Sequence, residues 1–125
     1  MSPVSAPAAI AGPESHDRSP SLVCSLRSDA SSAWVHAAGE VDIASCGQLE
    51  SVLGAANRAS PLIVLDLRGL TFIDGAGVHV IVSAADRARG QGGRLMVVRG
   101  CKQVDRVFTL TGAYEHVPIF KPDRP

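Results

Sequence analysis

The sequence predicts a single α/β domain with a mixed, mainly parallel sheet of four to five strands and helices packed against it. Short apolar segments alternate along the chain with segments whose apolar residues recur every three or four positions. Strands that alternate with helices are typical of a parallel sheet. Two extended segments precede the first helix, so a hairpin supplies one antiparallel neighbour. The 125 residues suffice for one core but not for two.

The first elements of the domain are a hairpin and a helix. The segments "LVCSLRSD" and "AWVHAAGE" alternate in part and are separated by a polar turn around residues 29–32. After Gly39 the period changes, and the spacing predicts a helix that ends near Ser60 and Pro61. Its apolar face comprises Cys46, Leu49, Val52, Leu53 and Ala56.

The central elements are a strand and a second helix. Residues 62–67, "LIVLDL", form a continuous apolar run, as expected of a strand covered on both faces. Residues 75–89 carry an apolar stripe at helical spacing, which ends at "GQGG". The later elements are a strand at "RLMVV", a helix over residues 104–111 that stops at Gly112, and an extended segment or last strand at "VPIF".

Composition limits the classes of partner. Residues 1–21 are rich in Pro, Ser and Ala, so we expect a disordered tail followed by a folded domain over residues 22–121. Twelve basic and twelve acidic side chains cancel, which argues against direct binding to nucleic acid or to a membrane surface. The three cysteines are widely spaced and favour neither a disulfide framework nor a zinc site. We therefore expect a cytoplasmic protein.

The stretch "LTFIDGAGVHV" joins the central strand to the second helix, where open α/β sheets place their working groups. Asp74 is a preferred N-cap residue, and its carboxylate would lie at the positive end of the helix dipole. Gly75 and Gly77 leave the backbone exposed, so another molecule could approach closely or an anion could meet the amides. The alternative is that Asp74 only caps the helix and the glycines only turn the chain.

Three segments resemble the STAS domain family of anti-sigma factor antagonists. "VLDLRGLTFIDGAGVHVI" is similar to the family's central signature, in which Phe-Ile-Asp and two small residues precede a helix that begins with Gly. "AAGEVDIASCGQLESVL" looks like its Gly-Glu-Leu-Asp segment, and "VDRVFTLTGAYEHVPIF" looks like its C-terminal segment. The resemblance covers about Leu22 to Phe120 and implies a single STAS-like domain.

The resemblance implies partner switching. Such domains bind an anti-sigma factor, usually a serine kinase, and so release a sigma factor; the kinase then phosphorylates a serine of the domain and breaks the complex. The matching position here is Ala76, preceded by Gly75, and neither residue has a hydroxyl group. The chain would then bind its anti-sigma factor permanently, be regulated by another input such as phosphorylation of Thr71 or Ser83, or have a different partner.

Helical geometry predicts the binding surface. Counting from Ala76, the face away from the core runs through His79, Ser83 and Arg87. We expect this stripe, the loop from Thr71 to Asp74 and the turn from Gly39 to Asp42 to contact the partner. Asp42 would either cap the following helix or touch the partner. The predicted site comprises Asp42, Thr71, Asp74, Gly75, Ala76, Gly77, His79, Ser83 and Arg87.

Other functions have less support in the sequence. "GAGVHV" lacks the third glycine of a dinucleotide fingerprint, and the four histidines are scattered, so neither a cofactor nor a metal is expected. Asp74 has no base or metal ligand near it in sequence, which argues against an enzyme. The alternatives are a structural subunit of a larger sensory complex and a nucleotide-binding protein with another partner. The oligomeric state stays open, and the sheet edge made by the first hairpin is one surface for a dimer.

Overall fold

A computed structural model of the chain describes residues 21–122. The predicted tail, apart from Ser21, lies outside the described residues. The elements in chain order are β1 (Leu22–Ser28), β2 (Ser32–Val41), α1 (Cys46–Ala59), β3 (Leu62–Ile73), α2 (Gly75–Gly90), β4 (Arg94–Val98), α3 (Lys102–Leu110) and a short 3-10 helix (Ala113–Glu115).

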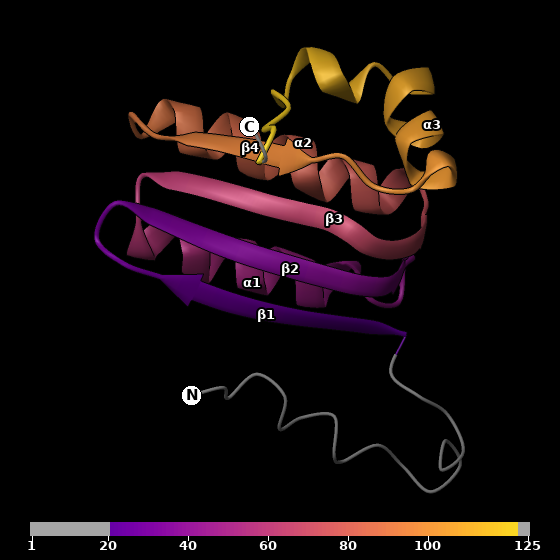
Figure 1. The fold of residues 1–125 in the computed structure, drawn as a ribbon, viewed down its shortest axis with the longest axis horizontal. Helices are drawn as coiled ribbons and strands as arrows, with labels where there is room; N and C mark the ends of the chain where they lie inside the picture. The colour runs from indigo at the N-terminus through magenta and orange to yellow at the C-terminus, as the bar shows by residue number, and fades with distance from the viewer. Residues whose placement is uncertain (1–20, 123–125) are drawn as a thin grey trace, which may run out of the picture.

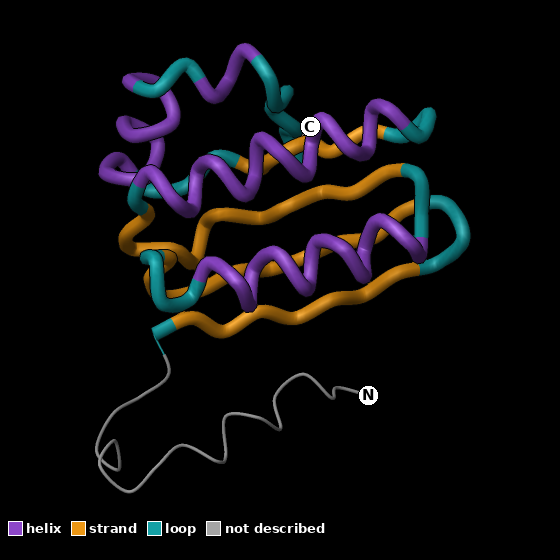
Figure 2. Tube along the Cα trace, turned by 180° about the vertical axis from the view of Figure 1, so that it is seen from behind, coloured by secondary structure: helices purple, strands orange, loops and turns teal. Residues whose placement is uncertain are grey.

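The sheet has four strands in the order β1-β2-β3-β4, with β1 antiparallel to β2 and the other pairs parallel. This confirms the predicted mixed, mainly parallel sheet. Helices α1 and α2 lie side by side against one face, while α3 lies at the end where β3 and β4 finish (Figures 1 and 2). The segment "VPIF" adds one parallel bridge between Val97 and Ile119, so it is an extended segment and not a fifth full strand.

Strand β3 is longer than the sequence predicted. It continues past residue 67 to Ile73, so the predicted loop from Thr71 to Asp74 is mostly strand. The pairing of β3 with β2 shifts between His36 and Ala38, because His36 pairs with Asp66 and Ala38 pairs with Gly69. This shift marks a bulge. At Gly69 an added Cβ would lie 3.0 Å from the Ala37 carbonyl oxygen. In the sequence Gly69 looks like a residue that ends a strand, but in the structure it is needed because β2 and β3 approach closely there.

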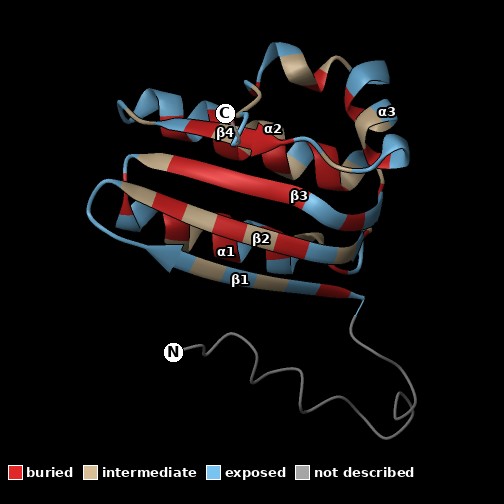
Figure 3. Cartoon of the chain, in the orientation of Figure 1, coloured by how far each residue is buried: buried red, intermediate tan, exposed pale blue. Residues whose placement is uncertain are grey.

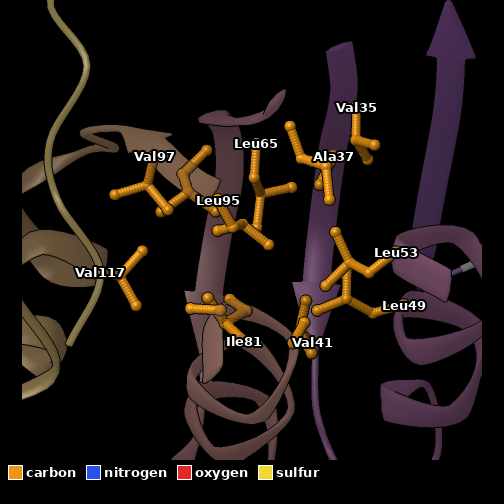
Figure 4. Packing of buried hydrophobic residues seen from close by; sticks show 14 of the residues in the cluster. Val35, Ala37, Val41, Leu49, Leu53, Leu65, Ile81, Leu95, Val97 and Val117 are labelled. Carbon is orange, nitrogen blue, oxygen red and sulfur yellow. The ribbon is translucent and has the colours of Figure 1, made fainter. Parts of the chain in front are cut away.

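The core lies between the sheet and the pair α1 and α2, and Figure 3 shows buried residues on the central strands and on both helices. Figure 4 shows Val35 and Leu65 from the sheet pointing into the same layer as Leu53 of α1 and Ile81 of α2. The predicted apolar face of α1 is buried except at Cys46, which is half-buried. Burial of these faces supplies the main favourable free energy of folding. It also fixes the starts of α1 and α2 at the end of the sheet where β2 and β3 finish.

The opposite face of the sheet carries a polar cluster under partial cover. The buried Asp66 carboxylate accepts from Nε of Arg68 at 2.9 Å and lies 3.0 Å from Nδ1 of His36. The hydrogen bond from Arg68 lowers the pKa of Asp66 below its usual value, against the opposite effect of burial. The ring of Trp34 stacks on His36 and meets Phe120 edge-on. This cluster satisfies its own polar groups.

Candidate partner-binding site

The entrance of α2 is formed where β3 ends. Asp74 follows the strand directly, and its Oδ1 accepts from the backbone amide of Gly77 at 3.1 Å, which confirms the predicted N-cap. The Asp74 amide donates to the Val41 carbonyl at 3.1 Å, so the ends of β2 and β3 are joined there. Figure 1 shows this edge at the right, where all three long helices begin.

The three small residues that open α2 have different environments. Gly75 is exposed and Ala76 is half-buried, so both lie at the surface. Gly77 is buried, and an added Cβ would lie 2.6 Å from Cγ1 of Val41 and 2.8 Å from Cγ1 of Ile73. This burial argues against direct partner contact at Gly77, because the residue packs α2 onto the strands from within.

The turn before α1 is held by Asp42. Its Oδ1 accepts from the backbone amides of Ala44 and Ser45 at 3.0 and 3.1 Å and from the Ser45 hydroxyl at 3.0 Å. Ser45 is the N-cap residue of α1, but its side chain makes no capping bond to the helix. Of the two roles predicted for Asp42, this geometry favours the structural one at the helix entry.

The outer face of α2 presents the predicted stripe. His79 and Arg87 are exposed and Ser83 is half-buried, as the helical spacing required. Nε2 of His79 lies 3.5 Å from the Ser83 hydroxyl, at the outer limit of a hydrogen bond. The exposed Thr71 hydroxyl, on β3, donates to the Gly39 carbonyl at 3.1 Å. The stripe lies along α2, and Thr71 lies on the strand that leads into this helix.

Two exposed apolar side chains at the same edge were missed by the sequence reasoning. Ile43, in the turn before α1, is 76% exposed, and Phe72, one residue before the end of β3, is 46% exposed. Since Ile73 is buried among the helices, alternation along the strand directs Phe72 to the other face. The sequence could have revealed Phe72 only if β3 had been extended to Ile73. A contiguous exposed apolar patch is typical of a protein-binding surface, whereas single exposed apolar side chains are common, so Ile43 and Phe72 are candidates for partner contact.

The described chain offers little for other chemistry. Within residues 21–122 no group of three or more side chains suited to a metal ion lies together. Over the same range no helix combines the length and the apolar character needed to cross a membrane. One amide of the first turn of α2, that of Gly77, donates to the Asp74 carboxylate.

Comparison with known proteins agrees with the fold and the motifs. A family model described as "Mlab, STAS domain" matches residues 24–118. This match spans well over half of the sequence, and the chain belongs to the STAS domain family.

Solved structures of anti-sigma factor antagonists share the fold. One from Mycobacterium paratuberculosis is 23% identical over 82% of this chain and 87% of its own, with a TM-score of 0.73. SpoIIAA in its unphosphorylated form is 18% identical, with coverages of 80% and 90% and a TM-score of 0.68. The Bacillus cell fate determinant SpoIIAA in the phosphorylated form is 17% identical, with coverages of 80% and 93% and a TM-score of 0.63.

Proposed function

We propose that this protein is a non-catalytic anti-sigma factor antagonist, which binds a serine-kinase-like anti-sigma factor and so frees a sigma factor. The descriptions of the similar solved structures support the general role. The accessible entrance of α2, with exposed Gly75 and the exposed apolar side chain of Ile43 in the neighbouring turn, supports binding at this end of the sheet.

The observation that carries the proposal is the chemistry at the start of α2. Gly75 and Ala76 reach the surface beside the Asp74 carboxylate, and neither can accept a phosphoryl group. A phosphate there would add about −1.5 to −2 charges next to that carboxylate. The volume of the phosphate and its electrostatic repulsion would then oppose a partner packed at this end of the sheet. Without a hydroxyl at either position, a bound kinase could not release itself by modifying residue 75 or 76.

The direct test is binding to candidate serine-kinase-like anti-sigma factors with and without ATP. We expect the wild-type complex to persist when ATP is added. In the Ala76→Ser variant we expect incorporation of one phosphate and loss of the complex with ATP. Ser83→Ala is the matched control, because it removes the hydroxyl nearest along the exposed stripe of α2. Wild-type release by ATP would contradict the missing switch, and failure to bind any such factor would contradict the proposed partner.

Nucleotide binding at the same edge is a weaker proposal. A phosphate at the start of α2 would lie beside the Asp74 carboxylate, which accepts from the Gly77 amide at 3.1 Å. The negative charges of the phosphate and of the Asp74 carboxylate would repel each other, so the capped helix start disfavours binding of an anion. Isothermal titration with ATP separates the two functions, because we expect no heat of binding from the isolated protein. ATP binding that Asp74→Ala strengthens would favour the nucleotide function.

A further inference from the structure

We infer that two copies of this chain pair through the outer edges of their β1 strands, antiparallel, with Ser25 facing the Ser25 of its copy. The result is one continuous sheet of eight strands. In the described chain β1 has a single neighbour, β2, and its other side is an edge (Figure 1). The inference does not depend on the proposed function.

The hairpin determines which backbone groups point outward. The amide of Asp29 donates to Ser32 at 2.9 Å, and that of Glu40 donates to Ser21 at 2.5 Å. These bonds mark hydrogen-bonded pairs at both ends of the hairpin, and such pairs alternate along an antiparallel ladder. Even-numbered residues of β1 therefore direct their N–H and C=O groups away from β2. These residues are Leu22, Cys24, Leu26 and Ser28.

Within residues 21–122, this edge lacks most of the features that usually prevent pairing. Natural edge strands are blunted by proline, bulges, inward charges or a covering element. Strand β1 has seven residues, pairs with β2 without a register shift and contains no proline. Its single charge, Arg27, is exposed on the face away from the helices. One edge carbonyl, that of Leu22, is covered by Nε2 of Gln48 at 3.1 Å. The formal net charge of zero does not oppose self-association.

One register pairs the whole strand with its copy. With Ser25 on the two-fold axis, all seven residues are matched, whereas an axis at Cys24 or Leu26 leaves residues unpaired. On the helix face, half-buried Cys24 meets half-buried Leu26 of the other copy. On the open face, exposed Val23 meets the stem of Arg27. No charge faces a like charge, so the strand is complementary to itself.

Helix α1 fits the same arrangement. Gln48 reaches the β1 edge at Leu22, and Ser25 lies about 10 Å further along the strand. At 1.5 Å per residue, Ala55 of α1 then lies roughly level with Ser25. Ser51 and Ala55, on the side of α1 that carries Gln48, are small. Helix α1 contacts both β1 and β2, so its axis and that of its copy would be about 10 Å apart, a usual packing distance.

Pairing through β1 leaves the entrance of α2 uncovered. That entrance lies beyond α1, at the edge where β2 and β3 end (Figure 2). A two-fold axis through Ser25 places the two entrances at opposite ends of the eight-stranded sheet. Each dimer would therefore present two equivalent surfaces that face away from each other.

Disulfide trapping tests the register. The full-length chain with Cys24, Cys46 and Cys101 replaced by alanine receives Ser25→Cys. In the non-hydrogen-bonded pair at the axis the Cα atoms lie about 4.5 Å apart, within the range of a disulfide. We expect mild oxidation to give mainly covalent dimer. Val23→Cys and Arg27→Cys, each alone, are matched controls that we expect to form no covalent cross-link, because each cysteine would lie about 14 Å from its own copy. The double variant should cross-link.

Sedimentation equilibrium of the full-length wild-type chain tests the dimer without cysteine replacement. We expect a mass that rises with concentration to twice that of the chain. Ser25→Asp places two carboxylates opposite each other and should shift the protein to monomer, whereas Ser25→Thr should leave the dimer intact. Ser25 is exposed, so neither variant disturbs the core. A wild-type monomer at every concentration, or a dimer that survives Ser25→Asp while Ser25→Cys fails to cross-link, would overturn the inference.

Discussion

Two helices begin at the same edge of the sheet behind an aspartate, yet their entrances are built differently. Before α1, Asp42 binds two backbone amides and the hydroxyl of Ser45, and that serine is buried. Before α2, Asp74 binds one amide, and the residues that follow are small and reach the surface. The first entrance is closed by its own side chains. The second leaves the start of the helix accessible to another molecule.

The comparison distinguishes residues that stabilise this end of the sheet from residues that are accessible to a partner. At α2 the structural task passes to Gly77, which lets the helix lie against Val41 and Ile73. Gly75 and Ala76 are then free of that task. Gly77 thus contributes to stability, whereas the adjacent Gly75 and Ala76 are accessible at the surface. Substitutions can test the two roles separately.

The largest expected effect is at Gly77. Replacing it with valine puts atoms where Val41 and Ile73 already lie, and we expect a loss of about 2 to 3 kcal/mol of unfolding free energy from overpacking. Gly75→Ala is the matched control, since a Cβ there meets nothing within 4 Å. It should stabilise the protein by about 0.5 to 1 kcal/mol. Urea denaturation measures both, and equal effects would contradict the division between the two glycines.

The second prediction compares the two aspartates. Asp42→Ala removes three hydrogen bonds to the carboxylate, although the Ser45 amide keeps the Asp42 carbonyl and the Ser45 hydroxyl keeps the Glu40 carbonyl. We expect a loss of about 2 kcal/mol. Asp74→Ala removes one capping bond and should cost about 1 kcal/mol. Asp42→Asn, which retains an acceptor oxygen, controls for charge. A larger loss from Asp74→Ala in the same urea experiment would show that the α2 entrance is the more structural one.

The third prediction concerns affinity and not stability. Ile43→Ser removes a 76% exposed apolar side chain from the edge, so folding should change little. Under the proposed function we expect the dissociation constant for the anti-sigma factor to rise about tenfold, which corresponds to about 1.4 kcal/mol. Val23→Ser is the control, because Val23 is also exposed but lies on β1. Equal losses from both variants would place the contact elsewhere.

The order and type of the elements followed from the sequence because the apolar period is strong in both helices and in the central strand. The extent of β3 did not follow. Arg68 and Gly69 interrupt the apolar run and look like a strand end, and the sequence does not show that β2 comes close enough to require a glycine. That contact depends on a strand about thirty positions away, so local pattern could not supply it.

The site was predictable where helical geometry alone decided it. The cap at Asp74 and the exposure of His79 and Arg87 depend on spacing within one helix. The burial of Gly77 and the exposure of Ile43 depend on how α2 and the turn before α1 lie against the strands. Those positions are set by tertiary packing. The run Gly-Ala-Gly at the helix start therefore gives no local sign that Gly77 is buried while Gly75 is exposed.

The smallest expected effect is at the far end of the α2 stripe. Arg87 lies eleven residues beyond Ala76, about 16 Å along the helix axis, and is exposed. A charge at the rim of an interface mainly changes the association rate. We expect Arg87→Ala to weaken partner binding about twofold, with the difference disappearing at high salt. Stopped-flow association at two ionic strengths measures this, with Arg58→Ala on α1 as control. A loss as large as that of Ile43→Ser would extend the contact along the whole of α2 and remove the distinction between its entrance and its outer face.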